Sequence, residues 1–244
     1  MIISHEHKFI FFKPLKVAGS SIEVALSKFC GPEDIQTGSE YVNEIAEHDY
    51  VPKNNTALYH THTPPALLYK KTGHCWDDYT RVTIVRNPWD LIVSYYWWSF
   101  NSPLSVHSTR AKPLETVGHQ LWKPMDNDSP DDIRNKFQGY LEQLAFFADT
   151  PYGNEGPETV IKWLSKRTQE FYGLSINRVI RFENIQQDFD EFCESIGVQP
   201  QPLPRLKSGQ RKKKMLYSEY YDDYSTFLVR KEFRPLIERF GYKF

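Results

Sequence analysis

The sequence predicts an α/β fold with a mostly parallel central sheet flanked by helices, built as one domain over residues 1–244. Short runs of β-branched and aromatic residues alternate along the chain with longer segments whose apolar residues recur at helical spacing. Strands that alternate with helices in this way run parallel, because each helix returns the chain to the same end of the sheet. The length of 244 residues suffices for one well-buried core and is short for two.

The first half of the chain predicts strands and helices in alternation. Pro14 ends the first strand, and Asn87 followed by Pro88 is typical of a helix start, where asparagine caps the helix and proline takes its first position. Residues 33–56 are polar and irregular in pattern. The predicted elements are, in order, a strand at 8–12, a helix at 20–30, a strand at 57–62, a strand at 81–86 and a helix at 88–100.

The second half predicts mostly helices. Residues 101–130 are rich in Pro, Ser and Asp and indicate a long surface loop, and loops of that length are often functional. Residues 199–214 form another loop, first rich in proline and then basic. The predicted elements are helices at 131–148 and 157–171, a strand at 178–182, a helix with Phe189, Phe192, Cys193 and Ile196 on one face, and a helical region at 218–240.

Composition excludes several classes of protein. A formal net charge of −1 gives no electrostatic case for a nucleic-acid partner. Cys30, Cys75 and Cys193 are widely separated and form no C-x-x-C pair, so they suggest neither a disulfide framework nor a cysteine zinc site. The apolar run near the amino end is too short for a signal peptide or a membrane span. We therefore expect a cytoplasmic protein with no membrane span.

Residues 13–23 (KPLKVAGSSIE) lie between the first predicted strand and the first predicted helix. A turn of small residues that enters a helix exposes backbone N–H groups, the helix dipole adds partial positive charge, and Lys16 adds a full charge. The segment predicts a P-loop-like phosphate cradle; the alternative is a plain strand–helix turn with a solvated lysine, since the G-x-x-x-x-G-K-[ST] spacing of NTPases is absent. The predicted cradle consists of Lys16, Val17, Ala18, Gly19, Ser20 and Ser21.

Residues 81–98 (RVTIVRNPWDLIVSYYWW) carry a second pair of hydrogen-bond donors. Arg86 ends a strand and Ser94 lies on the following helix, and a guanidinium with a hydroxyl can bind a second phosphate. In NTPases this strand commonly ends in a magnesium-binding carboxylate, so an arginine here favours a second anionic group instead of a metal. The alternatives are an ion pair for Arg86 and helix packing for Ser94.

Together the two segments resemble the PAPS-dependent sulfotransferase superfamily, particularly the branch with the carbohydrate and heparan sulfate 2-O-sulfotransferases. Residues 13–21 are similar to its 5′-phosphosulfate loop, and residues 86–96 match its 3′-phosphate element R-[ND]-P-x-x-x-x-V-S-x-Y. VIRFENIQQDF at 179–189 and the ending FGYKF resemble further parts of the family, whereas residues 33–56 and 100–157 do not. The resemblance implies PAPS as donor, no metal, and a hydroxyl-bearing acceptor, with a carbohydrate as the first choice.

One departure from the family concerns the lysine of the first loop. The family places lysine directly after proline, whereas Leu15 separates Pro14 from Lys16. Counting back from Gly19 aligns Lys16 with the family's catalytic lysine, and Lys13 is the alternative. By resemblance, Lys16 and the neighbouring backbone amides stabilise the negative charge that grows on the bridging oxygen of the donor.

Two histidines, His60 and His62, stand close together in the sequence Tyr59-His60-Thr61-His62. On the predicted strand at 57–62 alternate residues face one side, so both rings would point into one cleft. The 2-O-sulfotransferase branch carries an H-x-H here, which implies that His62 is the general base and His60 secondary. The alternatives are a metal site, for which no third His or Cys stands at a telling spacing, and surface histidines without a role.

The basic run RLKSGQRKKK at 205–214 leaves several interpretations open. A solvated loop, a nucleic-acid patch and a localisation signal all carry such runs. A basic loop often folds over the nucleotide in the family, which implies that Arg211 and Lys212 bind the donor. Three tryptophans could stack on a sugar, although core packing is favoured for the first two: Trp97, Trp98 and Trp122.

Two other classes of function stay open on the sequence alone. An atypical nucleotide kinase or other phosphoryl transferase would need magnesium and a carboxylate where Arg86 stands. A non-catalytic module that keeps the nucleotide site would bind without turnover, and the presence of Lys16, His62 and Arg86 argues against it. The oligomeric state cannot be read from the sequence.

Overall fold

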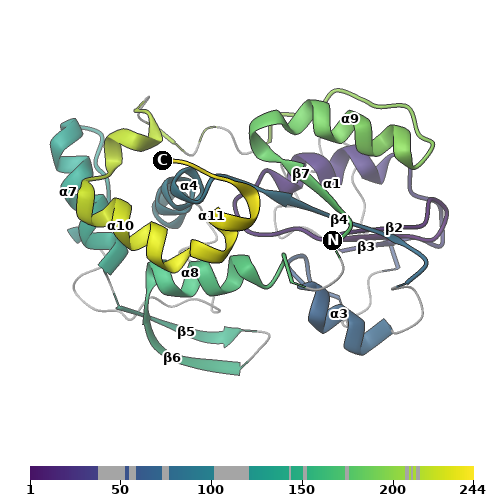
Figure 1. Ribbon diagram of the computed structural model, residues 1–244, viewed down its shortest axis with the longest axis horizontal. Coiled ribbons are helices and arrows are strands. Elements are labelled where there is room, and N and C mark those ends of the chain that lie inside the picture. The colour runs from purple at the N-terminus through teal and green to yellow at the C-terminus, as the bar shows by residue number, and fades with distance from the viewer. Residues whose placement is uncertain are drawn as a thin grey trace. The chain divides into compact units, whose positions relative to one another are not determined.

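The structure is a computed structural model whose described residues form two compact units, each built from two stretches of chain (Figure 1). The first unit comprises Met1–Arg86 and Glu170–Leu206, and the second comprises Asn87–Gln169 and Lys207–Phe244. The single domain expected over residues 1–244 stays a prediction. The structure describes residues 1–37, 53–54, 59–72, 77–101, 121–142, 144–150, 153–173, 176–206, 209, 211–212 and 215–244.

The described residues of the first unit build a five-stranded mixed sheet. Its strands are β1 (Ile2–Ser4), β2 (Phe9–Phe11), β3 (Ile35–Gln36), β4 (Thr80–Val85) and β7 (Arg178–Arg181). The strand order is β3-β1-β2-β4-β7, in which β2, β4 and β7 run parallel and β1 is antiparallel to both β2 and β3. The prediction of a mostly parallel sheet is therefore right only for β2, β4 and β7, because the short β1–β2 connection leaves no room for a crossover helix.

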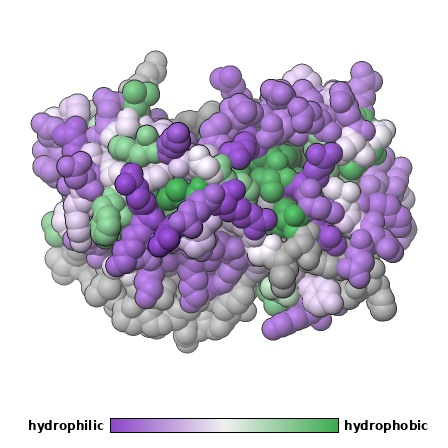
Figure 2. Space-filling view, in the orientation of Figure 1, coloured by the Kyte–Doolittle hydropathy of each residue, from purple (hydrophilic) through white to green (hydrophobic). Residues whose placement is uncertain are grey.

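Helices α1 (Gly19–Ser27), α3 (Pro65–Thr72) and α9 (Ile185–Ser195) flank this sheet. In Figure 1, α1 and α9 lie along one face and α3 lies on the other side. Of the predicted apolar face, Phe189, Phe192 and Cys193 are buried, whereas Ile196 follows the end of α9 and is half-buried. Phe192 meets Phe9 of β2 edge-on with 5.6 Å between the ring centroids. The outer surface of α9 is hydrophilic in Figure 2. The sheet and these helices place the carboxyl ends of β2, β4 and β7 at one edge, where ligands of α/β proteins bind.

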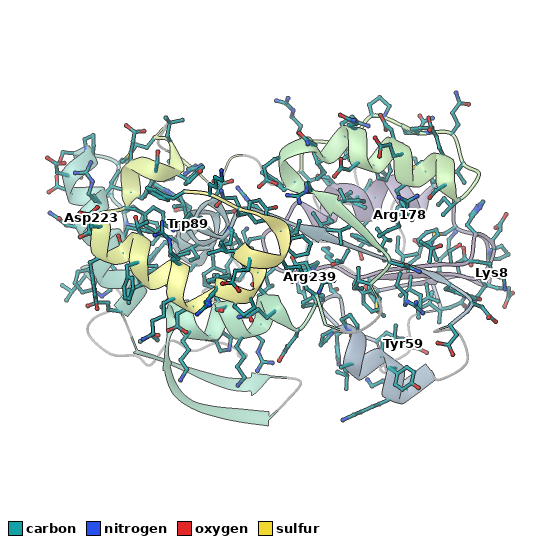
Figure 3. All side chains as sticks on the ribbon, in the orientation of Figure 1. Lys8, Tyr59, Trp89, Arg178, Asp223 and Arg239 are labelled. Carbon is teal, nitrogen blue, oxygen red and sulfur yellow. The ribbon has the colours of Figure 1, made fainter. Side chains whose placement is uncertain are left out.

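Helix α4 (Pro88–Asn101), seen nearly end-on in Figure 1, is the centre of the second unit. Asn87 caps it as predicted, because its Oδ1 accepts the Trp89 N–H at 3.0 Å. Trp89 lies among the surrounding helices (Figure 3), and the Trp97 indole donates to the Tyr220 hydroxyl at 2.9 Å. The other helices among the described residues of this unit are α7 (Pro130–Glu142), α8 (Val160–Gln169), the 3₁₀ helix η3 (Tyr217–Tyr220), α10 (Asp223–Glu232) and α11 (Arg234–Phe240). No helix in the described ranges is both long and apolar enough to cross a membrane.

Two predicted helices of the second unit extend too far. An antiparallel pair, β5 (Leu144–Thr150) and β6 (Gly153–Thr159), lies between α7 and α8, so the predictions of helices at 131–148 and 157–171 are wrong at those ends. The apolar residue at 144 continues the helical spacing of α7, but two adjacent phenylalanines followed by a Pro-Tyr-Gly sequence favour a hairpin.

The first unit contains the other differences from the predictions. Residues 59–60 have no regular structure and 61–62 form a turn, so the strand predicted at 57–62 is wrong where the chain is described. The turn is closed by the Thr63 N–H, which donates to the His60 carbonyl at 3.1 Å. Strands β1 and β3 were not predicted, because each is short and β3 includes a polar residue. Most of the loops expected at 33–56 and 101–130 lie outside the described residues.

Candidate active site

The segment after β2 is the one predicted to form a phosphate cradle. Its backbone has a φ of 60° at both Lys16 and Ala18, on either side of Val17. Left-handed conformations of non-glycine residues cost about 1–3 kcal/mol and gather at ligand-binding loops. Alternating backbone handedness also turns successive N–H groups toward one concave side. Helix α1 begins directly after this loop, and the Ser21 N–H closes its first turn on the Ala18 carbonyl at 3.0 Å. The loop and the helix start therefore suit an anionic group.

Arg86, at the carboxyl end of β4, is joined to this loop. Its Nη1 donates to the Lys16 carbonyl at 2.7 Å, and its guanidinium lies 3.9 Å from the centre of the Phe182 ring. The parallel register pairs Val85 with Arg181, so the next residue of each strand, Arg86 and Phe182, are neighbours. Stacking on an aromatic face and a bond to a carbonyl hold the guanidinium plane in place. The structure thus brings the two predicted anion-binding segments together at Lys16 and Arg86.

Lys13, the alternative catalytic lysine, is buried beneath the loop. Its side chain is 5% exposed, and its Nζ forms an ion pair with Glu23 Oε2 at 2.5 Å. The lysine stem crosses Gly19 so closely that a Cβ there would lie 2.5 Å from Lys13 Cγ. Although burial by itself raises the pKa of Glu23, the charges of Lys13 and of the Met1 amino group lower it to about 2. The Lys13 charge is therefore matched by a buried carboxylate.

His62 lies in the turn after residue 60 and bonds to the same segment. Its Nδ1 lies 2.7 Å from the Lys13 carbonyl oxygen. Because a carbonyl oxygen only accepts, Nδ1 carries the proton and Nε2 is left as an acceptor. His60 is held differently, since its peptide N–H donates to Thr63 Oγ1 at 3.0 Å. Both rings were expected to face one cleft because they would lie on a strand, and residues 61–62 form a turn instead. Across the described ranges no three His, Cys, Asp or Glu side chains are placed to hold a metal ion.

Two effects lower the pKa of His62 from its ordinary value of 6.5. Burial of part of the ring disfavours the charged form, and the positive charge of Lys13 acts in the same direction. The side chain keeps an exposed face, so solvent moderates the lowering. A ring whose pKa lies below 6.5 is neutral at pH 7 and becomes protonated only in acid. His62 is therefore in the state that accepts a proton.

Arg211 lies in the second unit. Its Nη1 donates to Asp90 Oδ1 at 3.3 Å, and its guanidinium lies 5.3 Å from the centre of the Tyr220 ring. Within the part of the chain that the structure describes, its Nε and Nη2 are buried without a hydrogen-bond partner. Buried donors left unsatisfied cost about 1–3 kcal/mol each, and more when charged. An anionic ligand would satisfy these two donors, which fits the predicted role of Arg211 in donor binding.

The structure gives less support to Lys212 and Ser94. Lys212 forms an exposed ion pair with Asp126 at 3.1 Å, and such surface pairs contribute little in water. Ser94 is half-buried on α4 in the second unit, whereas Arg86 ends the first unit. The joint binding of one phosphate by Arg86 and Ser94 stays a prediction.

Sequence reasoning missed three residues that hold the candidate site residues in place. Glu23 carried a usable signal, because it lies one helical turn after Gly19 and faces the same side of α1. Phe182 could have been found from the parallel alignment of RVTIVR with RVIRF. Asp90 had no such signal, since its partner Arg211 lies far along the chain.

An α/β fold with a left-handed loop at its strand ends and a neutral histidine beside it is compatible with a transferase of anionic groups. The family model of the sulfotransferase family matches residues 1–230. The chain therefore belongs to the sulfotransferase family, whose enzymes transfer a sulfonate group to a hydroxyl-bearing acceptor. Comparison with curated proteins and with solved structures gives no match.

Proposed function

We propose that the chain transfers the sulfonate group of PAPS to an acceptor hydroxyl and releases adenosine 3′,5′-bisphosphate. The observation that carries this proposal is a convergence within the first unit. Arg86 and His62 both bond to carbonyls of one loop, which is itself left-handed at Lys16 and Ala18. An anion cradle beside a neutral proton acceptor is the arrangement that sulfonate transfer to a hydroxyl requires.

The described residues fit an anionic donor. PAPS, when bound, supplies a sulfonate attached to a phosphate leaving group. Lys16 and the loop amides would bind the 5′-phosphosulfate and stabilise the bridging oxygen as the sulfur–oxygen bond breaks. His62 Nε2 would take the proton of the acceptor hydroxyl, with His60 secondary. The residues proposed to hold the donor are Lys16, Val17, Ala18, Gly19, Ser20, Ser21, Arg86, Ser94, Arg211 and Lys212.

Calorimetry on Arg86 tests the choice of donor. We expect adenosine 3′,5′-bisphosphate to bind about tenfold or more tightly than AMP, because a charged hydrogen bond contributes roughly 1.5–3 kcal/mol. Arg86→Ala should lose this preference. Since Arg86 also holds the loop through the Lys16 carbonyl, both affinities should fall, and their ratio is the quantity to measure. Arg81→Ala, at the other end of β4, is the matched control and should keep the preference. Equal affinities in the unchanged protein would contradict the assignment.

We infer a carbohydrate acceptor from a pocket within the second unit. Its volume is about 310 Å³, and Trp122 forms one wall, packed so closely on Gly139 that a Cβ there would lie 2.3 Å from the ring. An aromatic wall with amide and carboxylate groups around it suits a sugar, whose ring stacks while its hydroxyls bond. The polar side chains that line the pocket are Asn135, Gln138, Glu142, Asp222, Tyr224 and Ser225.

Replacement of Trp122 tests this acceptor class. Trp122→Ala should raise KM for a carbohydrate acceptor about 2- to 10-fold, which corresponds to the roughly 0.5–1.5 kcal/mol of one aromatic contact. The value of kcat should barely change, because stacking is equally strong before and during the reaction. Trp122→Phe should restore most of the affinity. Steady-state kinetics across carbohydrate, lipid and small hydroxyl acceptors provide the measurement, and an unchanged KM for every carbohydrate would refute the assignment.

A further inference from the structure

A buried ion pair lies directly beneath the cradle, and the proposed chemistry does not use it. Lys13 and Glu23 have side chains that are 5% and 0% exposed, and their charged atoms are 2.5 Å apart. The other carboxylate oxygen of Glu23 accepts the Met1 amino group at 2.7 Å. Buried charges cost several kcal/mol of desolvation each, so a pair such as this contributes little net stability. The main effect of the Lys13–Glu23 ion pair is to fix the positions of the groups around it.

The ion pair is connected to His62 through the main chain. The Lys13 side chain is fixed at its end by Glu23 and along its stem by contact with Gly19, so the Lys13 peptide has little freedom. The carbonyl of that peptide accepts the Nδ1 proton of His62 at 2.7 Å. The Met1 amino group, on the same carboxylate, also donates to the Thr61 carbonyl at 3.3 Å. The turn that carries His62 is thus held at two points, and both lead to Glu23.

We propose that Lys13 and Glu23 are positioning residues for His62: their buried pair fixes the Lys13 carbonyl, which keeps the imidazole proton on Nδ1 and directs Nε2 outward as the acceptor. The proposal rests on the proposed role of His62 as the base. It assigns Lys13 a function that differs from that of a catalytic lysine. Holding a base in one tautomer and orientation is worth a large factor in rate, because a reacting group misplaced by about 1 Å costs about 100-fold.

The pair also acts on His62 through its charges. The charged groups around the ring are Lys13, the Met1 amino group and Glu23; the first two lower the pKa of His62 and the carboxylate raises it. Removal of the lysine charge should therefore raise the pKa, and removal of the carboxylate charge should lower it further. These shifts follow from the charges alone, so the tautomer of the His62 ring in the variants, and not the sign of its pKa shift, reports the positioning.

Nuclear magnetic resonance of isotope-labelled histidine rings tests the positioning without any donor or acceptor. In the unchanged protein, His62 should show the Nδ1–H tautomer. The pKa of His62 should rise in Lys13→Met and fall in Glu23→Gln. Lys8→Met is the matched control, because Lys8 lies at the β1–β2 turn, at the opposite end of β2 from the loop (Figure 3), and it should leave the His62 titration unchanged. An Nε2–H tautomer, or shifts of the same sign in both variants, would overturn the proposal.

Kinetics separate this proposal from the proposed function. Lys13→Met and Glu23→Gln should each lower kcat about 10- to 100-fold with little change in KM for the donor. The acid limb of the rate profile should move with the pKa measured by resonance. If the pair variants lose the Nδ1–H tautomer while His62→Ala keeps full turnover, the base role fails and the positioning of the ring stands. If His62→Ala is inactive while the pair variants leave both tautomer and turnover unchanged, the positioning fails alone.

Either single substitution leaves a buried charge without its partner, and the chain could fail to fold. The double variant Lys13→Met with Glu23→Gln removes both charges at similar volume, and thermal unfolding checks that it folds. It should keep its fold and still lose about 10-fold or more of kcat, because the Lys13 peptide is no longer fixed. A folded double variant with unchanged turnover and an unchanged His62 tautomer would overturn the proposal.

Discussion

Lys16→Ala is expected to lower kcat by about 10²–10³-fold, the usual effect of removing one group that stabilises developing negative charge. The affinity for adenosine 3′,5′-bisphosphate should fall much less, because the charge on the bridging oxygen appears during the reaction. Turnover measured beside calorimetry on the same variant gives both quantities. Lys16 bonds to Arg86 through its main chain, so the alanine variant keeps that contact.

Lys13 provides the comparison for Lys16. Lys13→Met should be milder in kcat, since its ammonium group pairs with Glu23 at 2.5 Å beneath the loop. It should also lower the unfolding temperature more than Lys16→Ala does, because it leaves the Glu23 carboxylate without one of its buried partners. An inactive Lys13→Met together with a nearly normal Lys16→Ala would show that the alignment across Leu15 is wrong.

His62→Ala should lower kcat by about 10²–10⁴-fold, the range of general base catalysis. A base must be neutral, so turnover of the unchanged protein should fall as pH drops through the pKa of His62. Burial and Lys13 lower that pKa, so kcat/KM for the donor, which reports the free enzyme, should lose activity only below pH 6.5. A bound anionic donor acts in the opposite direction, so the limb in kcat should lie at higher pH. His62→Ala should remove both limbs.

His60→Ala and EDTA serve as controls for this assignment. His60 bonds through its peptide N–H to Thr63, which the alanine variant keeps, so its loss of turnover should be smaller. If both histidines held a metal, His60→Ala and His62→Ala would be equally inactive, and EDTA would inhibit the unchanged protein. Rate profiles of all three proteins with and without EDTA distinguish these cases, and nearly normal turnover in His62→Ala would end the base assignment.

Local patterns predicted the elements that carry the site. The strands at β2, β4 and β7 and the helices α1, α4 and α9 follow from β-branched runs, helical spacing and the Asn87-Pro88 cap. Parallel strands then place the loop after β2 and the end of β4 at one edge. The bond between Arg86 and the Lys16 carbonyl was not predicted. The hairpin β5–β6 was not predicted, because the residue at 144 continues the helical spacing of α7.

The contacts that orient the site could not be predicted, because they depend on distant pairings. His62 was expected on a strand, and only the folded chain shows that its turn is held by the Lys13 carbonyl, 49 residues earlier. The choice between Lys13 and Lys16 likewise rests on the contact of the Lys13 stem with Gly19, which no spacing rule reveals. The two buried, unsatisfied nitrogens of Arg211 depend on packing around Asp90 and Tyr220.

Transfer of labelled sulfur is the direct test of sulfonate transfer from PAPS by this protein. The protein is incubated with PAPS labelled in its sulfonate group and with a panel of carbohydrate, lipid and small hydroxyl acceptors, and the products are identified by mass. We expect a labelled sulfate ester on at least one acceptor, with equimolar adenosine 3′,5′-bisphosphate, and loss of the product in Lys16→Ala and His62→Ala. Binding of PAPS without transfer to any acceptor, or transfer of phosphate from ATP with magnesium instead, would contradict it.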